Sequence, residues 1–272
     1  MRIAIESTRS LLLLTMAVGW VVGGPGPTGI QGEATAGLTP IAASSEDSAA
    51  PHPAAGDSLA AALAEAGPAA VVAIHHGVDV SRHSGAVDWQ VIADQGFTFA
   101  VVKATEGVDL EDSAFQGHWP AIRKVGLRRG AYHFYVTEDD PVEQAEFFLR
   151  TVPFSSGDLV PVVDVELIGH NTPPGLAERL RTFLDHIEKR VGVKPMIYTS
   201  PHFWNRHLTA DFGDYPLWIA EYDVAAPVLP KGWEQWHLWQ SKGDATVEGV
   251  AKGADLNLGN PRLDAIASLL IP

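Results

Sequence analysis

From residue 71 onward, short apolar runs alternate with segments in which apolar residues recur every three or four positions. The runs predict buried strands, and the three-to-four spacing predicts amphipathic helices. This alternation is typical of β-α units built around a largely parallel sheet. Strands are expected at residues 72–80, 97–103, 130–136, 159–166, 195–199, 216–222, 237–240 and 253–256.

Helices are expected at residues 88–95, 113–125, 141–152, 174–190 and 261–270. Pro120 falls inside the second of these and is expected to kink or split it, whereas Pro141 suits the first turn of the third. Eight strands is the count of a closed β/α barrel. The later units leave little room for helices, so the prediction is a single-domain, irregular, TIM-like (β/α) barrel.

The stretch 161–166, Pro-Val-Val-Asp-Val-Glu, is apolar except for two carboxylates at its end. Successive side chains of a strand point to opposite faces, so Asp164 and Glu166 share a face, with Cα atoms about 6.5–7 Å apart. Burying two unpaired carboxylates beside valines is costly. A polar cleft at the strand end, where both act on one substrate, explains that cost. A structural ion pair with a buried Lys or Arg is the alternative.

Polar and aromatic residues gather at the expected strand ends, whereas the strand starts are apolar. The C-terminal ends of the strands of a β/α barrel form one rim, which carries the chemistry. The residues expected there are Asp79, Glu106, His133, Tyr135, Asp164, Glu166, Tyr198, Tyr222, Gln240 and Asp255. This clustering predicts a single site rich in carboxylates.

The N-terminal region predicts export. Arg2 and Arg9 precede an apolar run at 11–22, and Ala34-Thr35-Ala36 offers a small-x-small cleavage site. An uncleaved anchor is the alternative, although the run is short for a spanning helix of about 20 residues. We therefore expect a signal peptide or membrane anchor at 1–36, a flexible Ala/Pro/Ser/Gly-rich linker at 37–70 and a catalytic domain at 71–272. The protein is expected to be secreted or periplasmic.

Charge and cysteine content exclude several classes. The chain has 33 Asp and Glu against 19 Lys and Arg, a net charge of −14, which argues against nucleic acid or anionic membranes as partners. With no cysteine, thiolate catalysis, disulfides and Cys-based zinc sites are excluded. The histidines offer no helical pair with a third ligand, so no metal or other cofactor is expected. The protein is expected to be a monomer without an obligatory protein partner.

Nine motifs occur in register over about residues 74 to 271. They are Gly77-Val78-Asp79-Val80-Ser81, Val87-Asp88-Trp89, Lys103-Ala104-Thr105-Glu106-Gly107, Gly130-Ala131-Tyr132-His133-Phe134, Asp164-Val165-Glu166, Ile197-Tyr198-Thr199, Leu217-Trp218-Ile219-Ala220-Glu221-Tyr222, Trp239-Gln240 and Asp255-Leu256-Asn257. Together they resemble glycoside hydrolase family 25, the N-acetylmuramidases or Chalaropsis-type lysozymes. The resemblance implies an irregular, flattened β/α barrel.

The resemblance also implies an activity, hydrolysis of the β-1,4 bond between N-acetylmuramic acid and N-acetylglucosamine in peptidoglycan. Glu166 matches the family's general acid, and Asp164 matches the carboxylate that stabilises the reacting sugar or its acetamido group. Asp79 and Asp255 match two further active-site acids. Whether an enzyme carboxylate or the substrate's acetamido oxygen is the nucleophile stays open. A catalytically inactive glycan-binding barrel and hydrolysis of another N-acetylated polymer, such as chitin, are the competing functions.

Substrate binding is expected from aromatic and polar side chains near the acids. These are Tyr132, Tyr198, Trp218, Tyr222, Trp239, Gln240 and Glu106. Several of them have a structural alternative. For Trp218 and Trp239 the alternative is a place in the barrel core, and for Glu106 it is a role in orienting Lys103 or a loop.

Overall fold

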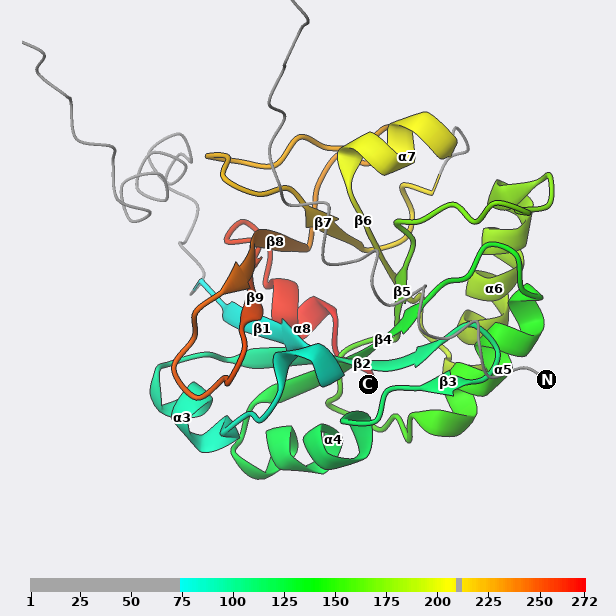
Figure 1. The fold of residues 1–272 in the computed structure, drawn as a ribbon. Helices are drawn as coiled ribbons and strands as arrows, with labels where there is room; N and C mark the ends of the chain where they lie inside the picture. Colours follow the sequence, from blue (N-terminus) through cyan, green and yellow to red (C-terminus); the bar gives the residue numbers. More distant parts are fainter. Residues whose placement is uncertain (1–73, 209–211) are drawn as a thin grey trace, which may run out of the picture. The chain divides into compact units, whose positions relative to one another are not determined.

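The computed structural model describes residues 74–208 and 212–272 (Figure 1). The expected signal peptide or anchor at 1–36 and the expected linker at 37–70 lie outside the described residues. Within the described ranges, no helix is both long and apolar enough to cross a membrane.

The described residues form a closed barrel of eight strands. These are β1 (His76–Val80), β2 (Phe99–Glu106), β4 (Arg128–Phe134), β5 (Val162–Asp164), β6 (Met196–Thr199), β7 (Leu217–Ala220), β8 (Leu238–Ala245) and β9 (Ala254–Gly259). The ring closes because β1 pairs with β2 on one side and with β9 on the other. The short strand β3 (Leu110–Glu111) pairs only with the end of β2. The predicted irregular α/β barrel is confirmed.

Strand β9 makes the barrel irregular. All other neighbours in the ring pair in parallel, whereas β9 is antiparallel to both β8 and β1. Antiparallel strands can be joined by a short connection, and here residues 246–253 join β8 to β9 without a crossover helix. The start of β9 therefore lies beside the C-terminal ends of the other strands. This places Asp255 opposite Asp79 in the register.

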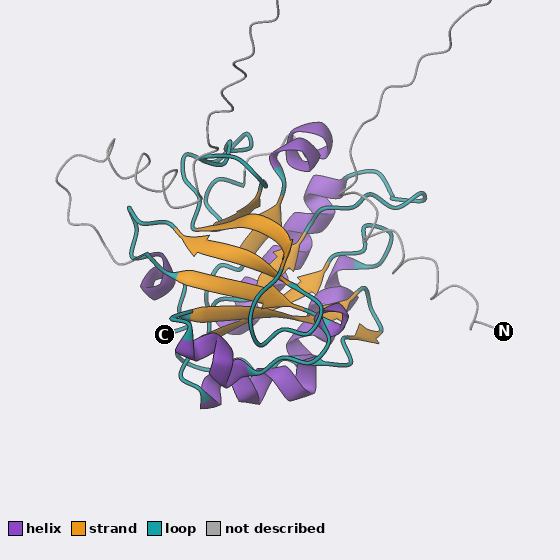
Figure 2. Ribbon diagram, turned by 60° about the vertical axis from the view of Figure 1, so that its left-hand side comes forward, coloured by secondary structure: helices purple, strands orange, loops and turns teal. Residues whose placement is uncertain are grey.

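The helices lie around the strands (Figure 2). They are α3 (Trp89–Asp94), α4 (Phe115–Lys124), α5 (Pro141–Thr151), α6 (Leu176–Val191), α7 (Pro201–His207) and α8 (Ala265–Ser268), with a 3-10 turn η1 at Arg82–Ser84. Side chains of Asp88, Asp140 and Ser200 accept backbone N–H bonds at the starts of α3, α5 and α7, where those groups have no partner within the helix.

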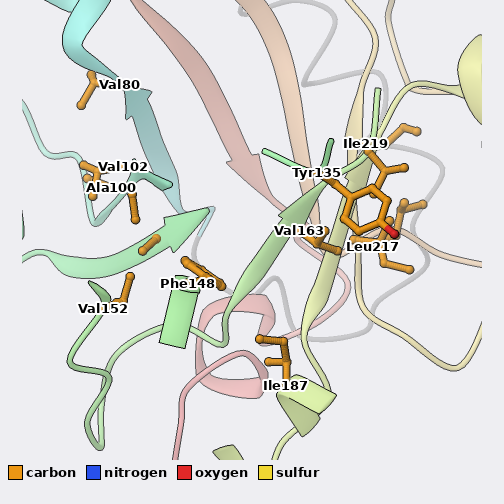
Figure 3. Close-up of a cluster of buried hydrophobic side chains, with 14 of the residues drawn as sticks. Val80, Ala100, Val102, Tyr135, Phe148, Val152, Val163, Ile187, Leu217 and Ile219 are labelled. Atoms are coloured by element: carbon orange, nitrogen blue, oxygen red, sulfur yellow. The ribbon is translucent and has the colours of Figure 1, made fainter. Parts of the chain in front are cut away.

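Strand alternation divides the apolar residues into two cores. The outer core packs one face of the strands, including Val80, Val102, Val163 and Ile219, against helical residues such as Phe148 (Figure 3). The inner core fills the barrel and includes Phe99, Val162, Met196, Trp218 and Leu238. Successive residues of a strand face opposite sides. The inward-facing residues that lie beyond the inner core, near the end of each strand, are therefore at the barrel rim.

The C-terminal segment closes the opposite end of the barrel. Backbone hydrogen bonds join Val160 N–H to Leu269 O and Ile271 N–H to Asp158 O, both at 2.8 Å. Ile266 and Leu269 pack into the inner core. The chain end therefore seals the end at which β5 begins, and the polar side chains gather at the other.

Several local expectations need correction. Helix α4 is not split at Pro120, because its buried face, with Phe115, Trp119 and Ile122, holds both halves against the outer core. Strand β2 extends through Glu106 rather than ending at Lys103, and β5 ends at Asp164.

Helix α7 was not expected at all. Its start is signalled by Ser200 as a cap and Pro201 in the first turn, the usual chemistry of a helix N-terminus. The last helix is shorter than predicted, Ala265–Ser268.

Candidate active site

Four carboxyl groups converge at the rim from three parts of the chain. Asp79 lies near the end of β1, Asp164 ends β5, Glu166 follows two residues later, and Asp255 lies near the start of β9. The alternation of side chains explains this arrangement. Val78, Val163 and Val165 face the outer core, so the acids that follow each of them face the barrel interior. The structure brings all four acids close enough for their charges to act on one another's pKa values.

Asp79 is held by two amides. Its Oδ2 accepts hydrogen bonds from Asn257 Nδ2 at 2.7 Å and from Gln240 Nε2 at 2.9 Å. Burial raises the pKa of Asp79 well above its usual value, and the negative charge of Asp255 raises it further, while the two amide bonds oppose the rise. The two amides therefore fix the orientation of the Asp79 carboxyl group.

Asp164 is buried, and one of its carboxyl oxygens, Oδ1, accepts no hydrogen bond from the described residues. Burial raises the pKa of Asp164 well above its usual value, and the charge of Glu166 raises it further, whereas Lys103 lowers it. A buried carboxylate without donors depends on a nearby positive charge to stay ionised.

Glu166 is partly buried in the loop after β5. Burial raises its pKa to about 7, with Lys103 lowering the pKa and Asp255 raising it. A carboxyl group with such a pKa carries its proton for much of the time near neutral pH. This is the property of a proton donor for a leaving oxygen.

Asp255 is anchored by the backbone. Its Oδ1 accepts a hydrogen bond from the Asp244 N–H at 2.6 Å, across the β8–β9 hairpin. Asp244 adopts a positive φ of 49°, a conformation that aspartate tolerates better than most residues. Burial raises the pKa of Asp255, and the Asp244 N–H lowers it.

Gln240 joins the acids to two tyrosines. Its Nε2 donates to Asp79 at 2.9 Å and to Asp255 at 3.4 Å. Its Oε1 accepts from Tyr198 Oη at 2.8 Å and Tyr222 Oη at 2.5 Å. The side-chain amide has no hydrogen-bonding capacity left for a substrate, because an amide oxygen accepts two bonds and the NH₂ donates two.

The aromatic residues expected in the site separate into two groups. Tyr132 and Tyr198 face the carboxyl groups, whose charges raise the pKa of both hydroxyls beyond the effect of burial. Tyr222 also joins them through Gln240, with 45% of its surface exposed. Tyr222 thus offers an open ring face beside the acids.

Two tryptophans do not offer such a face. Trp218 is 1% exposed inside the barrel, where its indole N–H donates to Asn257 Oδ1 at 2.8 Å. Trp239 belongs to the outer core and donates to the Glu221 carbonyl. Adjacent strand positions face opposite sides, so Gln240 reaches the site and Trp239 does not.

Glu106 forms an ion pair with Lys103, which was not predicted as a site residue. Its Oε2 lies 2.7 Å from Lys103 Nζ, and the two side chains are 13% and 5% exposed. Asn257 was missed as well, although it holds Asp79. The available signals were a lysine inside an apolar strand and an asparagine two positions after a predicted site acid.

The histidine expected at this rim lies elsewhere. His133 faces the outer core, between Thr105 Oγ1 at 2.8 Å and Gln144 Oε1 at 3.1 Å. Burial lowers its pKa to about 3, so it is neutral and structural. Within residues 74–208 and 212–272, no group of three His, Cys, Asp or Glu residues has the geometry of a metal site.

Comparison with known proteins identifies relatives of this chain. The sequence model of glycosyl hydrolases family 25 matches residues 78–250. The uncharacterized protein YegX of Escherichia coli O6:H1 is 38% identical over 196 residues, covering 70% of this chain and 71% of YegX. Lysozyme M1 of Streptomyces globisporus is 30% identical over 211 residues, with 71% of each chain covered.

A solved structure has the same fold. The bacterial lysozyme from Streptomyces coelicolor superposes with a TM-score of 0.63 at 29% identity, over 68% of this chain and 92% of the lysozyme. The matched sequence model and the shared barrel fold identify the same family. The chain belongs to glycosyl hydrolase family 25 and is a glycoside hydrolase.

Proposed function

We propose that this protein is an exported muramidase. It hydrolyses the β-1,4 bond between N-acetylmuramic acid and N-acetylglucosamine in peptidoglycan. Relatives named lysozyme support the substrate class. The observation that carries the residue assignment is the convergence of Asp79, Asp164, Glu166 and Asp255 at one barrel end, with the pKa of Glu166 raised to about 7.

Glu166 acts as the general acid. Its carboxyl proton passes to the glycosidic oxygen as the bond from that oxygen to C1 breaks, so the leaving sugar departs as a neutral alcohol. The sugar left behind becomes oxocarbenium-like and carries positive charge at C1 and the ring oxygen. Asp164, as a carboxylate, stabilises that charge or orients the acetamido group that shares it.

The reaction ends with water. Glu166, now ionised, takes a proton from the attacking water as the water oxygen bonds to C1 and the bond from C1 to the nucleophile breaks, and the acid is regenerated. Two routes lead to this step, with either a carboxylate or the substrate's acetamido oxygen attacking C1 first. A substrate analogue whose acetamido group carries electron-withdrawing fluorines separates them. A steep loss of rate with fluorination indicates attack by the acetamido oxygen.

Release of reducing ends from purified peptidoglycan tests the proposal, with chitin oligomers as a second substrate. We expect cleavage of peptidoglycan, with N-acetylmuramic acid at the new reducing ends. The Glu166→Gln variant should fold normally and lose at least about a thousandfold in kcat. Folded wild-type protein inactive on both substrates across a broad pH range contradicts the enzyme assignment, and activity on chitin alone contradicts the substrate.

Export is part of the same proposal. The substrate lies outside the cytoplasm, and the apolar run at 11–22 behind Arg2 and Arg9 supports a secretion signal. N-terminal sequencing of protein recovered from culture medium or periplasm should find a start near residue 37. A chain that keeps residue 1 and sediments with membranes indicates the anchor instead. The mature protein should run as a monomer in light scattering.

A further inference from the structure

Strand β2 carries an irregularity beside the active site. Its pairing with β4 shifts between Lys103, which faces Tyr132, and Thr105, which faces His133. The extra residue is Ala104, whose side chain packs in the outer core. Bulges of this kind redirect side chains and are frequent beside active sites.

The bulge places two charged residues on the same side of the strand. In a regular strand, residues three positions apart point to opposite faces. Here Thr105 follows Ala104 on the outer side, where it contacts His133 at 2.8 Å. Lys103 and Glu106 consequently both face the barrel interior, and their charged groups meet at 2.7 Å.

This ion pair is almost removed from solvent. The Lys103 and Glu106 side chains are 5% and 13% exposed, and Lys103 Nζ lies 4.8 Å from the centre of the Phe134 ring. Phe134 is the register partner of Asp164 on the neighbouring strand. The ammonium group is therefore held next to the strand position that carries a catalytic carboxylate.

Both members of the pair act on Asp164, and the effect of the lysine is the larger. Lys103 lowers the pKa of Asp164 more strongly than Glu106 raises it. Lys103 also lowers the pKa of Glu166. The ion pair thus has no net charge, but its combined effect on the pKa of Asp164 has the sign of the lysine charge.

We propose that Lys103 is a positioning residue that favours the ionised form of Asp164, and that the bulge at Ala104 exists so that Glu106 can fix the direction of the ammonium group. The charged and titratable groups that act on Asp164 are Asp79 on β1, Lys103 and Glu106 on β2, Tyr132 on β4, Glu166 after β5 and Tyr198 on β6. Lys103 supplies the positive charge in this set. The proposal rests on the catalytic roles given above for Asp164 and Glu166.

A substrate-free titration tests the ionisation directly. Carboxyl carbon NMR of the full chain follows the protonation of Asp164, whose signal is assigned by its loss in Asp164→Asn. In Lys103→Met, the Asp164 midpoint should move to higher pH by about one unit. Lys103→Arg retains the charge and should move it by much less.

The double variant Lys103→Met with Glu106→Gln guards against misfolding, because it leaves no unpaired buried charge. Since the lysine outweighs the glutamate at Asp164, the midpoint should still rise. Circular dichroism at each pH confirms the fold. An unchanged Asp164 midpoint in folded Lys103→Met and in the double variant overturns the proposal, whatever the substrate proves to be.

Kinetics then connects the titration to catalysis. On peptidoglycan, both limbs of the pH profile of kcat/KM should shift to higher pH in Lys103→Met, and Lys103→Arg should restore the wild-type limbs. A variant with lower kcat but unshifted limbs shows a merely structural lysine. Inactive wild-type protein with a shifted Asp164 midpoint in Lys103→Met separates failure of the proposed function from failure of this inference.

Discussion

Gln240, on β8, donates a hydrogen bond of 2.9 Å to Asp79, on β1, although 161 positions separate the two residues. The same amide accepts bonds from Tyr198 and Tyr222. One uncharged side chain thus fixes an acid on one side and two tyrosine hydroxyls on the other. We infer from these bonds that Gln240 positions the groups around it.

Replacing Gln240 by Leu removes four hydrogen bonds while keeping most of the side-chain volume. Asp79 loses one of its two amide donors, so we expect kcat to fall about 10- to 100-fold with a small change in KM. The free energy of unfolding should fall by about 1–3 kcal/mol, because buried polar groups lose their partners. Tyr222→Phe, which removes one hydroxyl, is the matched control. Wild-type kcat in Gln240→Leu contradicts this role.

The pH dependence of activity follows from Glu166. A general acid works in its protonated form, and the pKa of Glu166 is raised to about 7 by burial. The alkaline limb of kcat/KM on peptidoglycan should therefore fall near pH 7. A limb above pH 9 assigns proton donation to another group.

Stability should change with pH in the opposite sense to that of most surface acids. The usual pKa of Glu166 is 4.5 and the folded one is about 7, so the folded state holds the proton longer. The free energy of unfolding then decreases as pH rises from about 4.5 to about 7. Glu166→Gln should flatten part of that decline in urea titrations. Glu143→Gln, at an exposed position of α5, is the matched control for the removal of one carboxyl group.

Tyr222 and Trp239 should respond differently to substitution. Tyr222→Ala removes an exposed ring beside the acids, so KM on peptidoglycan fragments should rise about fivefold, as expected for a lost stacking contact of about 1 kcal/mol. Trp239→Phe acts on the outer core and should lower stability with KM unchanged. A raised KM in stably folded Trp239→Phe would show that the indole reaches the glycan.

Substitutions at the closed end of the barrel should change the free energy of unfolding without changing catalysis. Asp158 accepts bonds from Arg129 Nε at 2.7 Å and Arg123 Nη2 at 2.8 Å, and its side chain is 1% exposed. Asp158→Ala leaves Arg129 buried without its carboxylate and should cost about 3–5 kcal/mol of unfolding free energy. Arg123→Ala, at a half-exposed arginine, should cost about 1 kcal/mol or less. Both should keep wild-type kcat/KM at low temperature, since the site lies at the other end.

Much of the fold was predictable because its signals are local. Apolar runs and helical spacing identified all eight barrel strands and most helices, and Pro141 lies in the first turn of α5 as expected. Element ends were less predictable. Glu106 belongs to β2 because pairing with β3 and β4 extends that strand beyond its apolar part.

The site was predictable in part for the same reason. Inward alternation and position at the strand ends correctly brought Asp79, Asp164 and Glu166 together. The same rules failed for His133, whose strand turns that position outward, whereas Trp239 lies in the outer core, the alternative that was kept open for it. A difference of one position along a strand decides between site and core, and the sequence does not mark it.

The sequence by itself determined which residues are present, how they alternate along the strands and which family their spacing resembles. Only the tertiary structure decided that β9 runs antiparallel and so brings Asp255 opposite Asp79. It also decided that the bulge at Ala104 turns both Lys103 and Glu106 inward. Periodicity depends on neighbours along the chain, whereas strand direction and bulges depend on hydrogen bonds between strands that are distant in sequence.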